Sequence, residues 1–599
     1  MIFGHALLTG LGFLALLAGM PGKTPVADAA MYGNLAHVRL ALRQGANVNA
    51  AQGDGMTALH WAAFEDNVEM LKLLLAAHAN VNSATIDEAI TPLLLACTNG
   101  DPDAEEALLK AGANPNSVNS NGTTALMLAA ASGNPAAAKV LLDHGADVNA
   151  RESAHGQTAL MFAAAMDRAA VIPLLMAHGA DAGITTTSHA VEHVRVDEIG
   201  HVFYEWTPQQ SSESGGKAAE AEAQVKLANA AVQSDLDLFS RALGFQSAQL
   251  ALAKSRPQPP ETGIRTGADF VGGMTALLYA ARQGHVNAVR ALLDAGADIN
   301  QPNADKFTPL LIAIVNGHLD LAMYLLSRGA EPNRASLSGL TDLYATIDLQ
   351  WAPHASFPQP NTEQENTGYL DLMKALIEHG ANVNATLGKK SWFRSYFSDT
   401  SWVNPAGATA FWRAAQSSDI SAMHLLVEHG ADPKLSTKGA VTPLMAASGL
   451  GWGANWSVNA PAPPMEAVKY CVELGNDVTA VTPGGYTALH GAAFIGNNEM
   501  VTYLVSKGAK VDVRTKAGDS PADMANGPNR FALPHPDTVA LLEKMGSPNS
   551  HNCRSDQCVV MVAARPSGAS SAAKAEKETL DKFAVALGLR AAVYLAEAR

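Results

Sequence analysis

The stretch that decides the fold spans residues 124–156 and reads TALMLAAASGNPAAAKVLLDHGADVNARESAHG. Thr124 stands where a helix N-cap is expected, and residues 125–131 form a short apolar segment of helical composition. A second helix is predicted over 135–143, with proline in its first turn and Gly145 as its C-cap. Neither helix is long enough to bury its apolar face alone, so the unit must stack on copies of itself.

Copies of this unit recur along the chain. The helix caps are ten threonines followed by Ser520 in the same role, and seven of the ten intervals between successive caps are 33 or 34 residues. The threonines are Thr57, Thr91, Thr124, Thr158, Thr275, Thr308, Thr341, Thr409, Thr442 and Thr487. Most repeats end in Gly-Ala-Asp or a close variant. The Thr-Ala-Leu-His motifs at Thr57 and Thr487, with these endings, resemble the ankyrin repeat, a family built from helix pairs. The resemblance implies an all-α ankyrin-repeat solenoid of about 12 helix-pair repeats with long loop insertions.

The repeat pattern also indicates the domain organisation. Repeats 1–5 are expected over residues 23–184 and repeats 6–12 over 274–546, the latter interrupted by loops at 350–367, 385–408 and 451–464. Residues 185–273 form an insertion or linker, in which alternating residues between Val194 and Trp206 predict a hairpin. Residues 547–599 form a C-terminal tail.

Residues 1–22 lie outside the repeat pattern and contain no Asp, Glu, Lys or Arg. Their apolar run is short for a membrane span and typical of a signal-peptide core. No basic residue precedes the run and no clear cleavage site follows it. Two alternatives to a cleaved signal peptide therefore remain: an uncleaved membrane anchor, or a start codon assigned too far upstream. We expect a periplasmic or secreted protein, touching a membrane only through this segment. A cytoplasmic location is the alternative if the start is misassigned.

Charge and motifs exclude several functions. Lys plus Arg number 41 against 56 Asp plus Glu, a net charge of −15, which argues against a nucleic-acid partner. The sequence holds no His-Glu-x-x-His, Gly-x-Ser-x-Gly or P-loop motif, so we expect no enzyme activity, metal or cofactor. Cys97 and Cys471 fall at apolar helix positions. Cys553 and Cys558 could form a disulfide, a weak zinc fragment or two free thiols; export favours the disulfide.

The family resemblance implies a monomeric scaffold whose concave groove grips a protein or peptide partner. In this family the two positions after the Ala-Ala of a first helix face the groove. Here those candidates include Phe64, Glu65, Arg282, Gln283, Gln416, Phe494 and Ile495.

Aromatic residues suggest a second candidate surface. Six of the eight tryptophans fall between residues 351 and 456, and Trp402, Trp412, Trp452 and Trp456 are the candidate contact residues. These loops could instead pack on one another as a satellite core. Two other functions remain open: a small-ligand or glycan binder centred on the Trp-rich loops, and an enzyme with its active site in the 185–273 insertion.

Overall fold

The computed structural model describes residues 24–191, 193–196, 202–205, 269–351, 362, 364–389, 403–452, 459–529, 532–551, 553–555 and 558. The predicted signal segment, most of the 185–273 insertion and most of the tail lie outside these residues. The chain divides into two compact units. Unit 1 comprises Met1–Asp399, Pro405–Phe411 and His424–Ala431, and unit 2 comprises Thr400–Asn404, Trp412–Met423 and Asp432–Arg599.

Twenty-four helices in the described residues follow one another as pairs, which confirms the predicted all-α repeat solenoid. The first helices of unit 1 are α1 (Pro25–Met31), α3 (Ala58–Phe64), α5 (Pro92–Asn99), α7 (Ala125–Ser132), α9 (Ala159–Ala165), α13 (Ala276–Gln283), α15 (Pro309–Val315) and α17 (Asp342–Gln350). Their second helices are α2 (Leu35–Arg43), α4 (Val68–Ala76), α6 (Pro102–Lys110), α8 (Pro135–Asp143), α10 (Ile172–Ala177), α14 (Val286–Asp294), α16 (Leu319–Ser327) and α18 (Tyr369–Glu378).

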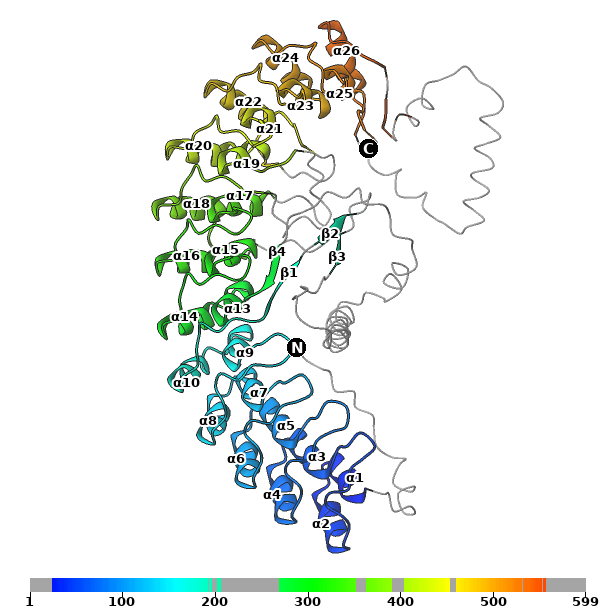
Figure 1. Cartoon of the computed structure of the whole chain (residues 1–599), viewed down its shortest axis with the longest axis vertical. Helices are drawn as coiled ribbons and strands as arrows, with labels where there is room; N and C mark the ends of the chain where they lie inside the picture. Colours follow the sequence, from blue (N-terminus) through cyan, green and yellow to red (C-terminus); the bar gives the residue numbers. More distant parts are fainter. Residues whose placement is uncertain are drawn as a thin grey trace, which may run out of the picture. The chain divides into compact units, whose positions relative to one another are not determined.

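Unit 2 repeats the same pattern. Its pairs are α21 (Pro443–Ala447) with α22 (Pro464–Glu473), α23 (Ala488–Phe494) with α24 (Asn498–Ser506), and α25 (Pro521–Ala525) with α26 (Pro536–Lys544). The pair α19 (Ala410–Gln416) and α20 (Ile420–Glu428) is divided between the two units. Within each unit the first helices form one layer and the second helices the other (Figure 1).

The repeat unit folds as its residues require. The hydroxyl of Thr124 accepts a hydrogen bond from the backbone N–H of Met127 over 3.2 Å, which satisfies one of the free donors at the start of α7. Ala129, Ala130 and Leu141 are fully buried, and α7 packs between α5 and α9. The small alanine side chains let neighbouring first helices approach closely, so the core forms between repeats as well as within each pair.

Asparagines at the repeat ends tie successive repeats together. At four of these positions, which include Asn333, the amide donates to a carbonyl of the next repeat, while the side-chain oxygen accepts from that repeat's backbone. Asn116 is an example: Nδ2 donates to the Gly145 carbonyl over 3.2 Å, and Oδ1 accepts from the Asp147 N–H over 2.8 Å. Asn82 and Asn149 make the same pair of contacts in the neighbouring repeats. The Asn of the repeat ending is therefore a structural residue.

Each repeat connects to the next through a finger, a short hairpin that leads into the first helix. A backbone hydrogen bond closes its base, as from Gln52 N–H to the Met56 carbonyl over 2.8 Å. The 185–273 insertion keeps this bond, because the Thr186 N–H donates to the Met274 carbonyl over 2.9 Å. At the 385–408 loop the Leu387 N–H likewise donates to the Ala408 carbonyl over 2.9 Å. Both segments therefore extend fingers.

Short strands lie at the larger insertion. β1 (Ser188–Val191) pairs with β4 (Asp269–Gly272), so the two ends of the insertion run antiparallel beside each other. The hairpin predicted between Val194 and Trp206 is confirmed, because β2 (His193–Val196) pairs with β3 (Val202–Glu205). Below the insertion α9 packs directly against α13, and the side chain of Gln157 donates to the Tyr279 hydroxyl over 2.7 Å.

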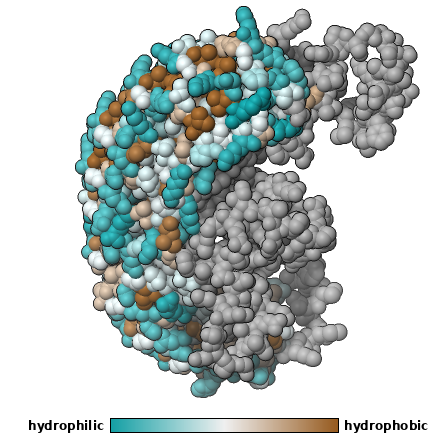
Figure 2. Space-filling model, turned by 45° about the horizontal axis from the view of Figure 1, so that its top comes forward, coloured by the Kyte–Doolittle hydropathy of each residue, from teal (hydrophilic) through white to brown (hydrophobic). Residues whose placement is uncertain are grey.

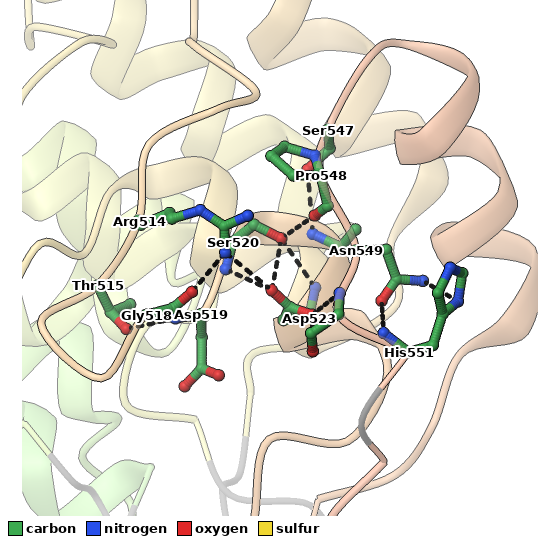
Figure 3. A network of polar contacts seen from close by, with 12 residues as sticks. Arg514, Thr515, Gly518, Asp519, Ser520, Asp523, Ser547, Pro548, Asn549 and His551 are labelled. Atoms are coloured by element: carbon green, nitrogen blue, oxygen red, sulfur yellow. Dashed lines mark hydrogen bonds and ion pairs between the residues drawn. The ribbon is translucent and has the colours of Figure 1, made fainter.

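A polar network closes the last repeat (Figure 3). The carboxylate of Asp523, buried in α25, accepts from the N–H and hydroxyl of Ser520 at 2.9 Å and from the N–H and hydroxyl of Ser550 at 2.7 and 2.6 Å. Ser520 also donates to the Pro548 carbonyl. These contacts fix residues 547–551 against α25, so the start of the tail covers the end of the stack.

Candidate partner-binding groove

The first-helix ends of unit 1 expose the side chains expected there. Phe64 is 53% exposed, and Glu65, Arg282 and Gln283 are also exposed. Phe64 and Glu65 stand at the end of α3, and Arg282 and Gln283 in the last turn of α13. The Phe64 carbonyl accepts from Asn99 Nδ2, and the Arg282 carbonyl lies 3.1 Å from His318 Nε2, so at these two positions the side chain is the group presented to another molecule.

An aromatic cluster lies at the ends of α1 and α3, which we call the N-terminal groove surface: Met31, Tyr32, Trp61 and Phe64. The rings of Trp61 and Phe64 meet edge to face, with centroids 5.9 Å apart. Tyr32 is 77% exposed and Met31 38% exposed. The surface therefore presents large apolar side chains that no other described part of the chain covers.

Hydrogen bonds hold this surface in place. The indole Nε1 of Trp61 donates to Gln52 Oε1 over 2.8 Å, and Gln52 Nε2 donates to Asp28 Oδ1 over 2.8 Å. On the other side, Asn99 Nδ2 donates to the Phe64 carbonyl over 3.1 Å. The cluster thus joins α1, α3, a finger and α5, and ordering it for a partner costs little side-chain entropy.

Met31 and Tyr32 were missed by the sequence prediction. The series of capping threonines was started at Thr57, so the groove positions of repeat 1 were not assigned, although Thr24 stands at the N-cap of α1. The signal was nevertheless present, because Met31 and Tyr32 follow Ala29-Ala30 just as Phe64 and Glu65 follow Ala62-Ala63. The rule used for the other repeats finds them.

A second exposed site lies on α13. The guanidinium of Arg282 lies 5.1 Å from the ring centroid of Tyr279, a cation–π distance. The Tyr279 hydroxyl accepts from Gln157, so the ring is held from the neighbouring first helix. This arrangement offers a fixed positive charge on the same layer of helices.

The candidates in and near unit 2 are less accessible. Phe494 is only 8% exposed, while Ile495 and Gln416 are half-buried. The Ile495 side chain packs against Gly449, where a Cβ would come within 2.7 Å of it. Because Phe494 is buried, it is a core residue more than a contact residue.

Trp412 is placed differently from the prediction. Its side chain has no exposed surface, and its Nε1 donates to the Val441 carbonyl over 3.0 Å. An indole in this position fills the interior of the repeat, so Trp412 is a core side chain and offers no contact surface. Trp452 is half-buried, while Trp402 and Trp456 lie outside the described residues. The aromatic binding site predicted on these loops therefore stays a prediction, without Trp412.

The second helices of unit 2 line a groove of their own, separate from the first-helix layer. A surface groove of about 830 Å³ runs along α24 between α22 and α26. Its lining includes Met465, Tyr503 and Leu541 together with Lys469, Glu499, Asp537 and Lys544. Hydrophobic residues show among hydrophilic ones over these C-terminal helices (Figure 2). Its acidic and basic residues are present in equal number, so the groove selects no charge class of ligand.

Two buried carboxyl groups have strongly shifted pKa values. Burial raises the pKa of Glu105 to about 8, with a smaller contribution from the charge of Asp101. Burial also raises the pKa of Asp342 well above its usual range. Both side chains are fully buried, so they contact no solvent-borne substrate in this structure. Among the described residues no three His, Cys, Asp or Glu side chains gather closely enough to hold a metal ion.

The tail cysteines lie side by side. Cys553 and Cys558 are paired, with Cα atoms 6.1 Å apart, a separation usual for disulfides. The adjoining backbone is anchored, since the Arg554 N–H donates to the Gly527 carbonyl over 2.9 Å and Arg554 forms an ion pair with Asp519. Cys97 and Cys471 are buried free thiols whose pKa values are raised by burial.

Comparison with known proteins agrees with this geometry. The family model described as ankyrin repeats (3 copies) matches residues 7–85, 91–186 and 231–336, and the model for a single ankyrin repeat matches 484–516. These matches cover a little over half of the chain, and the chain belongs to the ankyrin-repeat family. The first match begins inside the predicted signal segment. No helix in the described ranges has both the length and the apolar character needed to cross a bilayer.

One curated protein with a similar stretch is the transient receptor potential cation channel subfamily A member 1 homolog of Caenorhabditis elegans. It is 25% identical over 179 residues, which are 27% of this chain and 14% of the channel protein. The chain therefore spans only a small part of that relative's length, and the likeness concerns the repeats.

Proposed function

We propose that this chain is a non-catalytic scaffold that binds a protein partner through the first-helix layer of its ankyrin repeats. Ankyrin repeats generally mediate protein–protein interaction. The observation that carries the proposal for this chain is the exposure of Tyr32 and Phe64 on a surface held by hydrogen bonds. Exposed aromatic residues on an ordered support are the usual anchors of protein interfaces.

The test compares two exposed apolar residues on opposite layers. Phe64→Ala removes an anchor from the N-terminal groove surface, whereas Leu40→Ala removes a 48% exposed leucine from the second helix α2. Partners crosslinked to the full chain in its native source should be lost with Phe64→Ala and retained with Leu40→Ala, at unchanged melting temperatures. Equal retention of the partner by both variants would contradict the proposal.

Export is the second part of the proposed function. The uncharged apolar segment 1–22 supports a periplasmic or secreted scaffold. N-terminal sequencing of the native protein, combined with cell fractionation, tests this directly. A chain that retains Met1 in the cytoplasm would rule out export.

A further inference from the structure

Charge is segregated between the two helix layers of residues 24–150. Every Lys and Arg in this range lies on a second helix: Arg39 and Arg43 on α2, Lys72 on α4, Lys110 on α6 and Lys139 on α8. The first helices, the links that follow them and the fingers carry acids instead. These acids are Asp28, Asp54, Glu65, Asp66, Asp87, Glu88 and Asp101. The groove side of the first three repeats thus carries acids and no Lys or Arg, whereas at the fourth repeat Arg168 donates its Nε to the Ala131 carbonyl at the end of α7.

The histidine on the groove side, His60, does not change its net charge. His60 is fully buried, its pKa is lowered by burial, and its Nδ1 accepts from the Thr57 N–H over 3.1 Å. It is therefore neutral at pH 7. The field over the groove side of the first three repeats is negative, and it favours positively charged ligands.

Two of the acids lie together beside the aromatic cluster. Asp66 follows α3 and Asp101 is the N-cap of α6. The hydrogen bond that protonated Asp66 donates to Asp101, then burial, then the negative charge of Asp101 raise the pKa of Asp66. Asn99, just before Asp101 in the chain, donates its Nδ2 to both the Ala63 and the Phe64 carbonyls. This contact joins the link that carries Asp101 to the end of α3. Two carboxyl groups held this close repel when both are ionised, and a cation placed between them removes that repulsion.

We propose that the N-terminal groove surface binds a basic, extended segment of its partner protein, with apolar side chains packed on Tyr32 and Phe64 and an Arg or Lys held by Asp66 and Asp101. This rests on the proposed function and adds the chemical class of the partner. Exposed apolar side chains continue along the fingers at Ile86 (71%) and Val118 (45%). An extended segment can therefore reach apolar contacts on successive repeats while its charges face the acids.

The chemistry favours a peptide over other cations. A simple ion would use the carboxylates but not the adjacent aromatic rings, and a nucleic acid would be repelled by the acidic side. Arginine suits a carboxylate pair because its planar guanidinium donates several hydrogen bonds at once.

Three labelled peptides of about twelve residues test the proposal by fluorescence anisotropy with the full chain. One alternates Leu and Arg, the second Leu and Glu, and the third Ser and Arg. The Leu-Arg peptide should bind at least about tenfold more tightly than either of the others at low ionic strength. Its affinity should fall several-fold at about 0.5 M salt, because exposed charges are screened.

Matched variants locate the site. Asp66→Asn/Asp101→Asn removes two charges and keeps the local backbone, since Asn tolerates the positive φ of residue 66 and serves as an N-cap at 101. Glu69→Gln/Asp143→Asn removes two exposed charges from second helices. The first double variant should bind the Leu-Arg peptide at least about fivefold more weakly, and the second should bind as the parent does.

Equal binding of the Leu-Arg and Leu-Glu peptides, or equal effects of the two double variants, would overturn the proposal. The test also separates it from the proposed function. If Phe64→Ala loses the native partner while Asp66→Asn/Asp101→Asn keeps it, the groove binds a partner that is not basic. If neither variant loses the partner, both proposals fail.

Discussion

The indole Nε1 of Trp412 donates a hydrogen bond to the backbone carbonyl of Val441, with 3.0 Å between nitrogen and oxygen. His60 makes the equivalent contact in repeat 2, where its Nε2 lies 3.0 Å from the Ile90 carbonyl. Since His60 Nδ1 accepts from Thr57, its Nε2 carries the proton and donates. Trp412 therefore replaces the ankyrin histidine, joining the first helix to the finger of the following repeat with a larger, fully buried side chain.

Truncation of Trp412 should destabilise the protein strongly. Trp412→Ala leaves a cavity and an unpaired carbonyl, so we expect a loss of about 3–5 kcal/mol in the free energy of unfolding. Trp412→His keeps the donor and should lose less. Urea denaturation of the parent, Trp412→Ala and Trp412→His, followed by circular dichroism, ranks their free energies of unfolding. An alanine variant as stable as the parent would show that the indole is not part of the core.

Glu105 should make stability depend on pH. Its buried carboxyl has a pKa of about 8, above its usual value of 4.5, so the native state binds the proton more tightly than the unfolded state. Stability from this group is full below pH 4.5 and is lost as pH rises toward about 8. Glu105→Gln should flatten this dependence and stabilise the protein by up to a few kcal/mol near pH 8.5.

The exposed neighbour Glu106 supplies the control for that prediction. Its pKa is lowered, chiefly by hydrogen bonds from Lys110 and His144, so Glu106→Gln should not stabilise the protein at high pH. Thermal unfolding of both variants between pH 5 and 9 makes the comparison. Parallel profiles of stability against pH for Glu105→Gln and the parent would contradict the raised pKa of Glu105.

Asp523 should stabilise the C-terminal repeat at neutral pH and lose this effect in acid. Burial by itself raises the pKa of Asp523, but the hydrogen bonds from Ser520 and Ser550 outweigh it and hold the pKa below its usual value of 3.8. Its contribution is therefore present above pH 3.8 and disappears as pH falls further. Asp523→Ala leaves several donors unpaired and should cost about 1–3 kcal/mol at pH 7. Hydrogen exchange should then be faster in residues 547–551, and unchanged exchange there would count against the network.

The tail cysteines should form a disulfide in the exported protein. Mass spectrometry of the unreduced tail peptide should show the loss of two hydrogens, and Cys553→Ser should abolish it. Because the closed loop is short, the stabilisation should be at most a few kcal/mol. Alkylation of both thiols under oxidising conditions would contradict this prediction.

The sequence was sufficient for the fold because the repeat signals are local. Thr124 caps its helix, and the Ala-rich faces can only be buried by stacking, so the period itself implies the architecture. The candidate site was only partly predictable. Phe64 and Glu65 follow from the repeat, but the burial of Trp412 depends on a carbonyl 29 residues away in the next finger. Similarly, the proximity of Asp66 and Asp101 arises only when two repeats stack.

Hydrogen exchange of the full chain with and without its native partner tests the central claim most directly. The account predicts protection at the ends of α1 and α3, the fingers of repeats 2 and 3, and the link around Asp101, with second helices unchanged. Protection confined to second helices, such as α22, α24 and α26, or none in residues 24–150, would contradict it.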